Sequence, residues 1–348
     1  MQNVPLNEPM SFDLYTNFSG DGSSNKFMKV FPIGEVFEVD DLNEIQEKYG
    51  RLYVLEEQRH LFLSGLISGN DISEEKKSEI IKSSAIEYLD QLFEPNKKFS
   101  TELLTQSVKK CQDAVAVMVD LVQDYSIDAL QAHIARLSFH DFYTYDHSVN
   151  VAMYCIAFQR FLKPDSSQEE LSLAGLGGML HDIGKIQIST SIINKPEKLS
   201  PQEFAEIQRH PWFGKELLCE VDFEAPKGVD LDVLKRVVFE HHESFDGSGY
   251  PEGLKGEEIH RMARLTAICD FFDAITTKRA YNTVVSIPDA LAIMSKAAGV
   301  KIDPNLFKSF CMHCGGKEPS SDSVSVLASD FDPCQPTKGL PLKGYRQS

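Results

Sequence analysis

Five separated fragments of this chain carry histidine and aspartate side chains of the kinds that bind transition metals. Imidazole and carboxylate ligands together suit iron, manganese, zinc or nickel. Half of the ten histidines fall in these fragments, which favours one shared site over five unrelated core or surface positions. The predicted metal ligands are His147, His181, Asp182, His210, His241, His242 and Asp270.

Two metal ions are predicted because Asp182 can bridge them. The adjacent pairs His181-Asp182 and His241-His242 fall where we expect helices to end, so neighbouring side chains can turn toward different ions. In two-metal hydrolases, ions about 3.5–4 Å apart share a hydroxide that becomes the nucleophile at neutral pH. Asp182 is therefore predicted to be catalytic, and the pattern indicates a metal-dependent phosphohydrolase.

Two short loops beside these ligands have compositions typical of ligand binding. Lys185 follows Asp182 by three residues, and we assign its ammonium to a phosphate oxygen, where it offsets charge building on phosphorus. The alternative is a lysine placed at a helix end by the macrodipole. The second loop, called here the Gly-Tyr-Pro loop, spans residues 246–251. Its glycines can adopt positive φ and bring backbone amides close to a ligand, although a simple turn has the same composition.

Composition indicates a globular protein that does not track along a nucleic-acid polymer. The 348 residues are 42% hydrophobic, enough for a sizeable core and two domains. The formal charge of −17 disfavours extended contacts with a phosphate backbone. No apolar run approaches the roughly 20 residues of a membrane span, and the first residues lack signal-peptide features. We therefore expect a cytoplasmic protein, without a disulfide framework among its seven cysteines.

A small α+β domain is predicted at the N-terminus, over residues 1–124. Strand signals occur at three places, 27–31, 35–39 and 52–55. Asp71 or Ser73 can cap a helix that ends near Phe93, and Ser100 opens another. This region has no ligand pattern, so we assign it by default a regulatory or interaction role, including homodimer formation.

Residues 125–314 are predicted to form helices only, with proline or glycine at most of the joins. The expected spans are 145–162, 168–181, 201–219, 230–242, 260–277 and 287–298. Residues 315–348 are rich in Ser, Asp, Pro and Gly, which predicts a loose tail. The fold class is therefore mainly α, an all-helical domain preceded by a small α+β domain.

The ligand fragments resemble, in order, the metal-dependent HD superfamily, and most closely its HD-GYP branch. The similarity covers roughly residues 125–310. It is carried by Tyr145 to Ala152, His181 to Lys185, His210-Pro211, His241-His242-Glu243, the Gly-Tyr-Pro loop, and Asp270 to Tyr281. HD-GYP domains are all-helical and hydrolyse cyclic di-GMP, so the resemblance implies cleavage of that ligand to linear pGpG, GMP or both.

The resemblance also implies how two divalent ions, Fe or Mn, with Zn or Ni as alternatives, share the ligands. One ion would be held by His147, His181, Asp182 and Asp270, and the other by Asp182, His210, His241 and His242. Family members with three ions have a glutamate where this chain has Tyr143, and a phenol with a pKa of about 10 is a poor substitute. Asp273 is predicted to support a histidine from the same helix face as Asp270.

Substrate contacts implied by the resemblance come from Lys185, Tyr250 and Arg279, with cyclic di-GMP or a related cyclic dinucleotide as the ligand. Arg264 could instead tie helices together. Ala280 and Asn282 depart from the usual family pattern. Three functions therefore stay open: a cyclic di-GMP phosphodiesterase, a non-hydrolysing receptor that signals to a protein partner through the Gly-Tyr-Pro loop or the N-terminal domain, and a phosphohydrolase for another nucleotide.

Overall fold

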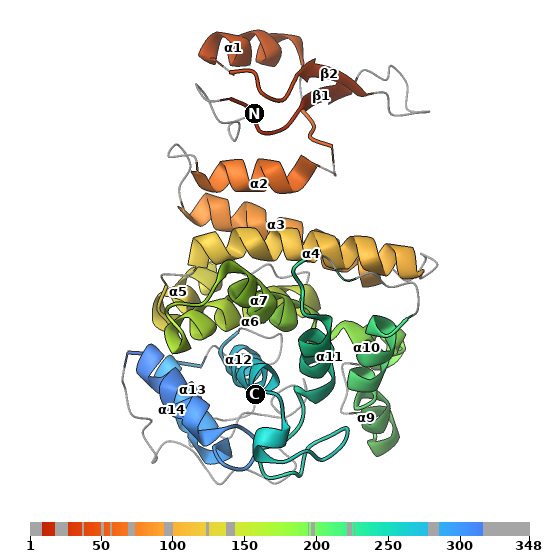
Figure 1. The fold of residues 1–348 in the computed structure, drawn as a ribbon, viewed down its shortest axis with the longest axis vertical. Coiled ribbons are helices and arrows are strands. Elements are labelled where there is room, and N and C mark those ends of the chain that lie inside the picture. The colour runs from red at the N-terminus through yellow and green to blue at the C-terminus, as the bar shows by residue number, and fades with distance from the viewer. Residues whose placement is uncertain are drawn as a thin grey trace. The chain divides into compact units, whose positions relative to one another are not determined.

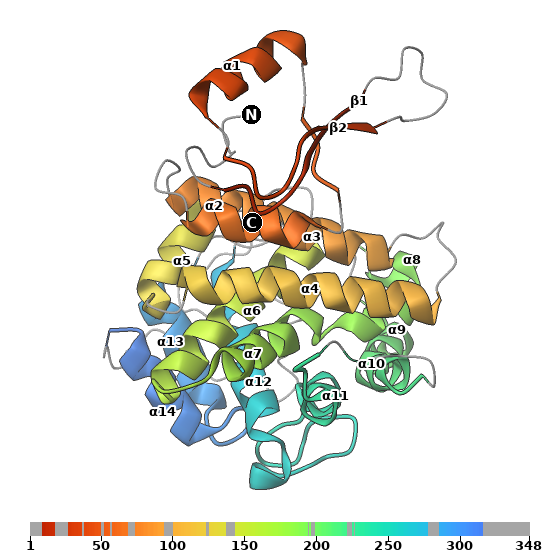
Figure 2. The same cartoon turned by 45° about the horizontal axis from the view of Figure 1, so that its top comes forward.

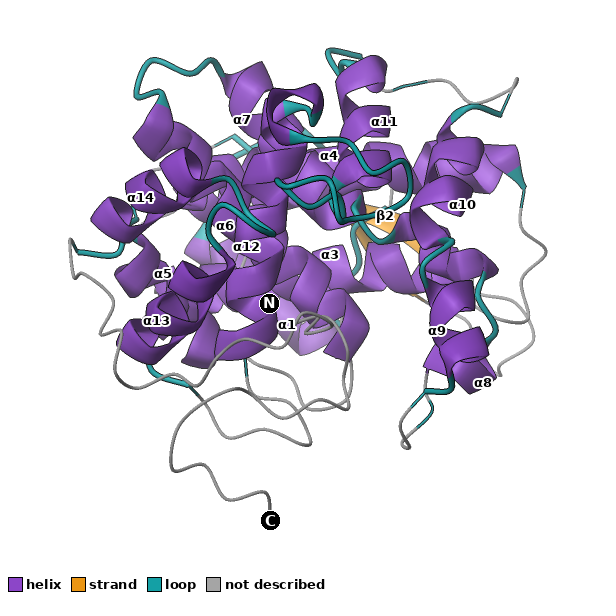
Figure 3. Ribbon diagram, turned by 90° about the horizontal axis from the view of Figure 1, so that it is seen from below, coloured by secondary structure: helices purple, strands orange, loops and turns teal. Residues whose placement is uncertain are grey.

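Helices form most of the structure, a computed structural model that describes residues 9–17, 27–36, 38–49, 52–55, 58–68, 74–93, 100–122, 125–136, 143–193, 195, 199–220, 225, 227–277 and 285–315. The chain falls into two compact units, Met1–Ser84 and Ala85–Ser348. Figure 3 shows the described helices in purple and the short sheet in orange. The predicted fold class, mainly α with a small N-terminal α+β part, is confirmed.

The sheet of the first unit consists of β1 (Leu14–Asn17) and β2 (Phe27–Phe31), paired antiparallel. β2 lies where a strand was predicted, whereas β1 was not predicted. Leu14 lies opposite Phe31, and both side chains are buried. They belong to a core cluster that also contains Met10, Phe12 and Ile45.

A strand at 35–39 was wrongly predicted, because a helix begins inside that span. Val36 forms only an isolated bridge with Pro9, and α1 (Val39–Lys48) starts three residues later. Glu38 and Asp41 form a capping box at this start, in which the backbone amide of Glu38 donates to the Asp41 carboxylate at 2.9 Å. The acidic first turn therefore favours a helix over a strand.

Residues 52–55, also predicted as a strand, contribute only an isolated bridge between Tyr53 and Tyr15. The helix α2 (Arg59–Ser68) follows. The next helix, α3 (Glu74–Phe93), ends at the predicted residue and contains the point at which the two compact units divide.

The second unit is built around α6 (Tyr143–Leu162) and α12 (Arg261–Thr276), which contact each other and several further helices (Figure 1). The other elements are α4 (Thr101–Val122), α5 (Ile127–Arg136), α7 (Gln168–Leu180), η2 (Ile183–Gln187), α8 (Thr190–Ile193), α9 (Pro201–Ile207), α10 (His210–Leu218), α11 (Leu231–Glu240), η3 (Gly256–Glu258), α13 (Ile287–Ala297) and α14 (Pro304–His313).

Glycines on α7 let this helix approach its neighbours closely. A Cβ atom at Gly178 would lie 2.9 Å from the Cα atom of Ala152 on α6, and one at Gly175 would lie 2.8 Å from the side chain of Ile156. α4 also packs on α6 and α7, along which it runs in Figure 2. The C-terminal end of α7, which carries two predicted ligands, is thereby held against α6, which carries another.

The predicted helix 201–219 is wrong as a single helix, because α9 ends at Ile207 and α10 begins at His210. Pro211 is the second residue of α10. A proline lacks the amide that a continuous helix needs, and its ring clashes with the carbonyl four residues earlier. Because of this break, His210 lies at the start of a helix and not in its interior.

The predicted limits at residues 124 and 314 concern functional domains and stay predictions. α4 belongs to the second compact unit, because it packs on α6 and α7, and side chains such as Leu104, Val108 and Val115 are buried. The predicted tail lies outside the described residues from 316 onward. No described helix is both long and apolar enough to cross a membrane.

Candidate metal centre

The second unit brings all seven predicted ligands together from five segments. His147 lies near the start of α6, Asp270 lies within α12, and the other five lie at the ends of helices. They form two groups, and within each group the potential ligand atoms lie within 4.8 Å of one another. The four-ligand group is Asp182, His210, His241 and His242; the three-ligand group is His147, His181 and Asp270.

Three of the histidines are oriented by backbone carbonyls at helix ends. The Nδ1 atom of His181 lies 2.7 Å from the carbonyl oxygen of Gly178. The Nδ1 atoms of His210 and His241 likewise lie 2.7 and 2.9 Å from the carbonyl oxygens of the residues three positions earlier. A carbonyl oxygen can only accept a hydrogen bond, so the proton is on Nδ1. The Nε2 atom of each ring therefore carries a lone pair, as a metal ligand must.

These lone pairs face one another and a carboxylate oxygen. The Nε2 atoms of His210 and His241 are 3.2 Å apart, and they lie 3.2 and 3.8 Å from the Oδ1 atom of Asp182. That oxygen is buried and has no hydrogen-bond donor among the described residues. Electron-rich atoms held this close in a buried site repel one another unless a cation lies between them. The four-ligand group therefore fits a metal ion.

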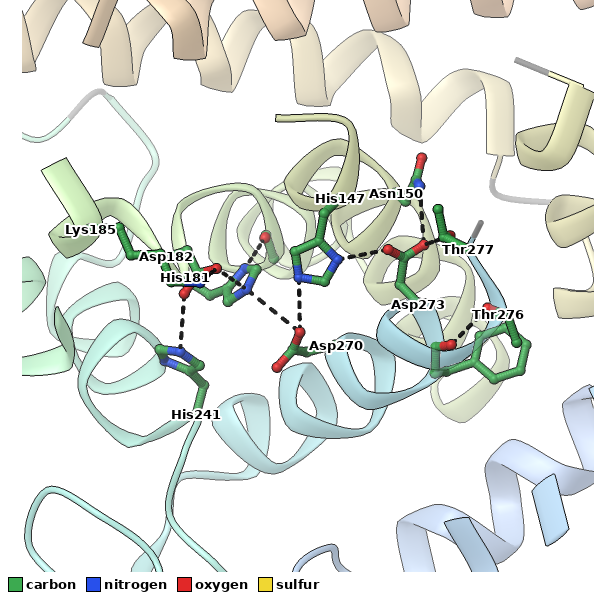
Figure 4. A network of polar contacts seen from close by, with 12 residues as sticks. His147, Asn150, His181, Asp182, Lys185, His241, Asp270, Asp273, Thr276 and Thr277 are labelled. Carbon is green, nitrogen blue, oxygen red and sulfur yellow. Dashed lines mark hydrogen bonds and ion pairs between the residues drawn. The ribbon is translucent and has the colours of Figure 1, made fainter. Parts of the chain in front are cut away.

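His147 is held between two carboxylates of α12. Its Nδ1 atom lies 2.7 Å from Asp273 Oδ2, and its Nε2 atom lies 3.0 Å from Asp270 Oδ1 (Figure 4). Asp273 in turn accepts hydrogen bonds from Asn150 Nδ2 at 3.0 Å and Thr277 Oγ1 at 2.7 Å. The prediction that Asp273 supports a histidine is confirmed, whereas Asn150 and Thr277 were missed, although both stand one helical turn from a predicted residue.

The two groups meet at Asp182 and His181. The Oδ1 atom of Asp182 faces the four-ligand group, whereas its Oδ2 atom lies 3.3 Å from His181 Nε2, which belongs to the three-ligand group. His181 Nε2 is also 3.8 Å from Asp270 Oδ1. The geometry suits a carboxylate that contributes one oxygen to each group.

Burial and charge set the protonation states of the ligands. Burial lowers the pKa of His210 and of His242 to about 3, and it lowers the pKa of His241 well below the usual range. Burial alone would raise the pKa of Asp182, but Lys185 and His181 outweigh it and hold that pKa far below its usual value. Neutral imidazoles and ionised carboxylates are the forms that bind metals.

His147 is the exception. Burial opposes its protonation, but the hydrogen-bonded carboxylates of Asp270 and Asp273 outweigh burial and raise its pKa to about 9. The pKa of Asp270 is lowered, against the effect of burial, by His147 and His181. A proton on His147 therefore competes with a cation for the space beside Asp270.

Lys185 lies in η2, the 3-10 helix that begins directly after Asp182. Its Nζ atom is 2.5 Å from Asp182 Oδ2, and 20% of its side chain is exposed. Its backbone amide donates to the Asp182 carbonyl at 2.9 Å, so a tight 3-10 turn brings the ammonium to the same site. The lysine is therefore able to contact both a ligand carboxylate and an anion arriving at the centre.

Gly184 allows η2 to touch the start of α10. A Cβ atom at this position would lie 1.9 Å from the carbonyl oxygen of His210 and 2.4 Å from the amide nitrogen of Gly214. These are backbone atoms that cannot rotate away. The glycine between Asp182 and Lys185 thus brings His210 within reach of the Asp182 carboxylate.

The Gly-Tyr-Pro loop folds back over the residues after α11. Gly247 has a φ of +87°, and a Cβ atom at Gly249 would lie 2.1 Å from the amide nitrogen of Ser244. The Tyr250 ring stacks on His242, with centroids 4.8 Å apart and planes inclined by 26°. The loop therefore reaches the metal centre through its tyrosine.

Two other predicted positions have different outcomes. Arg264 ties helices together, since its Nη1 atom lies 2.5 Å from the carboxylate of Asp303, the N-cap of α14. Arg279 lies outside the described residues, as do Ala280 and Asn282, and the side chain of Tyr143 is not described either. The substrate contact assigned to Arg279 stays a prediction.

Residues 129–306 match the HD domain family. A cyclic di-GMP phosphodiesterase of Pseudomonas aeruginosa is 39% identical over 202 residues, 56% of this chain and 46% of the relative. A 3'3'-cGAMP-specific phosphodiesterase of Vibrio cholerae is 37% identical over 166 residues, 47% of this chain and 34% of the relative. The matches thus span half or less of these relatives.

Among solved structures, Bd1817, an HDG"Y"P protein from Bdellovibrio bacteriovorus, has a similar fold, with a TM-score of 0.55 and 19% sequence identity. The similarity covers 91% of this chain and 98% of that structure. At this level of identity the likeness concerns the fold alone.

Proposed function

Because this chain belongs to the HD domain family, we propose that it is a metal-dependent cyclic dinucleotide phosphodiesterase acting on cyclic di-GMP. The observation that carries the proposal is the convergence of the His210 and His241 lone pairs on the buried Asp182 oxygen, a cluster that a cation stabilises. The names of the relatives from Pseudomonas and Vibrio support a cyclic dinucleotide as the substrate class.

We further propose that the centre holds two divalent ions, Fe or Mn, with Zn or Ni as alternatives. The four-ligand and three-ligand groups would each hold one, with Asp182 contributing to both. Divalent ions bound there supply Lewis acidity toward a phosphodiester and make water a stronger nucleophile at neutral pH. Tyr143, in place of a glutamate, supports two ions over three.

The chain's own residues then bind and orient the substrate. The Lys185 ammonium, 2.5 Å from Asp182, lies where it can offset negative charge on the phosphodiester during attack by water. Tyr250, stacked on His242, would contact the ligand from the loop side, and Arg279 would contact phosphate or guanine. Water adds to phosphorus and the ribose 3'-oxygen leaves, which yields linear pGpG and, after a second hydrolysis, GMP.

A second candidate substrate is 3'3'-cGAMP. The Vibrio relative bears that specificity in its name, and Ala280 and Asn282 depart from the usual pattern next to Arg279. Loss of a basic residue near the base-binding region would change base preference more than it changes the chemistry of the phosphodiester.

The test is incubation of anaerobically purified protein, loaded separately with Fe(II) and Mn(II), with each cyclic dinucleotide, followed by chromatography of the products. We expect linear dinucleotide or GMP, absent from the Asp182→Ala variant. Ligand that binds but stays intact under both metals would instead support a receptor. Cleavage of bis(p-nitrophenyl) phosphate without cleavage of either dinucleotide would indicate another nucleotide substrate.

We also propose a protein partner, a homodimer and a cytoplasmic location. The N-terminal region or the Gly-Tyr-Pro loop would bind a protein partner, and a homodimer would form through the N-terminal region. Cytoplasmic action follows from the expected substrate, an intracellular signalling nucleotide. Size-exclusion chromatography with light scattering tests the dimer directly.

A further inference from the structure

His242 is oriented differently from the other histidines of the centre. The rings of His181, His210 and His241 each bond a backbone carbonyl, and His147 bonds Asp273. Within the described part of the chain, the His242 ring makes no hydrogen bond, and three other rings lie against it. Its neighbours are Tyr250 at 4.8 Å, His241 at 4.2 Å and His210 at 5.0 Å between ring centroids.

Of these neighbours, only Tyr250 lies nearly parallel to His242, at 26°, so its ring covers one face of the imidazole. The other two rings are inclined by 44° and 87° and belong to fellow ligands. The orientation of His242 therefore depends on where the Gly-Tyr-Pro loop places Tyr250.

Glu243, the residue after His242, holds that loop. Its side chain is 4% exposed, and its Oε1 atom accepts from the Glu252 amide at 2.7 Å while its Oε2 atom accepts from the Leu254 amide at 3.0 Å. Both amides lie just beyond the proline that ends the loop. One buried carboxylate thus fastens the loop's exit to the residue adjacent to a predicted ligand.

We propose that Glu243 is a positioning residue: by fastening the exit of the Gly-Tyr-Pro loop, it keeps Tyr250 stacked on His242 and so keeps the His242 imidazole directed at the four-ligand group. The inference rests on the proposed role of His242 as a metal ligand. The backbone amide of Tyr250 supports the same geometry, because it donates to the His242 carbonyl at 3.2 Å.

The first measurement uses metal-free protein and tests the loop alone. Glu243→Gln replaces one accepting oxygen by an amide group that cannot accept, so one backbone amide loses its acceptor. We expect faster hydrogen exchange in the peptide covering residues 250–254. Unchanged exchange there would overturn the first step of the inference, whatever the protein does with metals or nucleotides.

The second measurement is a Mn(II) titration against a fluorescent chelator, which reads metal affinity without turnover. Both Glu243→Gln and Tyr250→Ala should weaken one class of Mn(II) site by about 10- to 100-fold and leave the other class unchanged. The double variant should lose little more than the worse single variant, since both act on one ring. Tyr250→Phe retains the stacking ring and should retain the affinity.

Glu240→Gln is the matched control. Glu240 is an equally buried glutamate three residues earlier, but its carboxylate accepts from the His260 amide and from Arg236, not from the loop region. We expect its Mn(II) affinities to match wild type. Equal losses in Glu240→Gln, or no loss in Tyr250→Ala, would overturn the route through Tyr250. Wild-type protein that binds no Mn(II) would instead refute the metal centre proposed above.

Discussion

The two ligand groups are built by different means. In the four-ligand group, His210 and His241 bond carbonyls three residues earlier, within their own segments. In the three-ligand group, His181 bonds a carbonyl in the same way, but His147 depends on Asp273, which lies 126 residues away in the sequence on another helix. Local backbone contacts form whenever the helix end forms, whereas the Asp273 contact requires that α6 and α12 pack correctly. The four-ligand group should therefore tolerate distant substitutions better.

The groups also differ in protonation. Burial keeps the four-ligand histidines neutral, with pKa values of about 3 for His210 and His242. The paired carboxylates raise the pKa of His147 to about 9. Metal binding at neutral pH must displace a proton from the three-ligand group but not from the other.

Asp182→Ala should have the largest effect, because this carboxylate faces both groups. We expect both ligand groups to lose their metal and turnover to fall by more than about 1000-fold. This loss is larger than the one expected from removing a residue that only supports a ligand. Metal analysis after gel filtration and product chromatography measure the two losses. Retained metal in the three-ligand group would show that Asp182 serves only one of them. Circular dichroism checks that the variant is folded.

Gly184→Ala should damage the four-ligand group selectively. The added Cβ would meet the His210 carbonyl, so η2 and α10 must separate, at a cost of about 3 kcal/mol in the free energy of unfolding. Urea denaturation measures this cost, and Mn(II) titration should show weaker binding in one class of site. Gly65→Ala is the control, because its Cβ would meet atoms no closer than 3.5 Å within α2's own unit. That substitution should be neutral or slightly stabilising.

Asp273→Asn should weaken the three-ligand group by about 10- to 100-fold and leave the four-ligand group unchanged. The amide keeps the shape but loses the charge that orients and polarises His147. Thr277→Val, which removes one donor to the other Asp273 oxygen, should give a smaller loss of the same kind. If both classes of site weakened equally in Asp273→Asn, the two groups would not be independent.

Metal affinity of the three-ligand group should rise by about tenfold per pH unit from pH 6 to about 9, because a proton on His147 competes with the cation. The four-ligand group should show little change over this range. The stability of the metal-free protein should change in the opposite direction. A raised folded-state pKa contributes stability below about 6.5, the unfolded value, and this contribution is lost as pH rises through about 9. If the metal affinity of both ligand groups did not change with pH, competition between a proton on His147 and the cation would be contradicted.

Local sequence patterns determined much of the architecture. Helix α12 was predicted to within one residue at each end, and the seven predicted ligands lie in two clusters that could each hold a metal ion. The resemblance to the HD superfamily is confirmed by the match to the HD domain over residues 129–306. Ligand types are readable because few other side chains bind such metals, so their order along the chain is informative without a structure.

Other features were missed from the sequence, two of them despite a local signal and one because it depends on the fold. The strand predicted at 35–39 failed because a capping box decides the start of α1, and the helix predicted over 201–219 is divided by Pro211. The sequence predicted no separate role for Glu243, which is part of a longer motif. Only the fold shows that its carboxylate accepts hydrogen bonds from two backbone amides of the loop region.

The sequence by itself determined which side chains could bind metals, because that depends on residue type and spacing. Only the tertiary structure decided how each ring is held: His210 by a carbonyl, His147 by Asp273 and His242 by Tyr250. The reason is physical. Which nitrogen carries the proton depends on the partner within hydrogen-bond distance, and for His147 that partner comes from a distant helix. For His242 the ring that covers it comes from a loop that folds back.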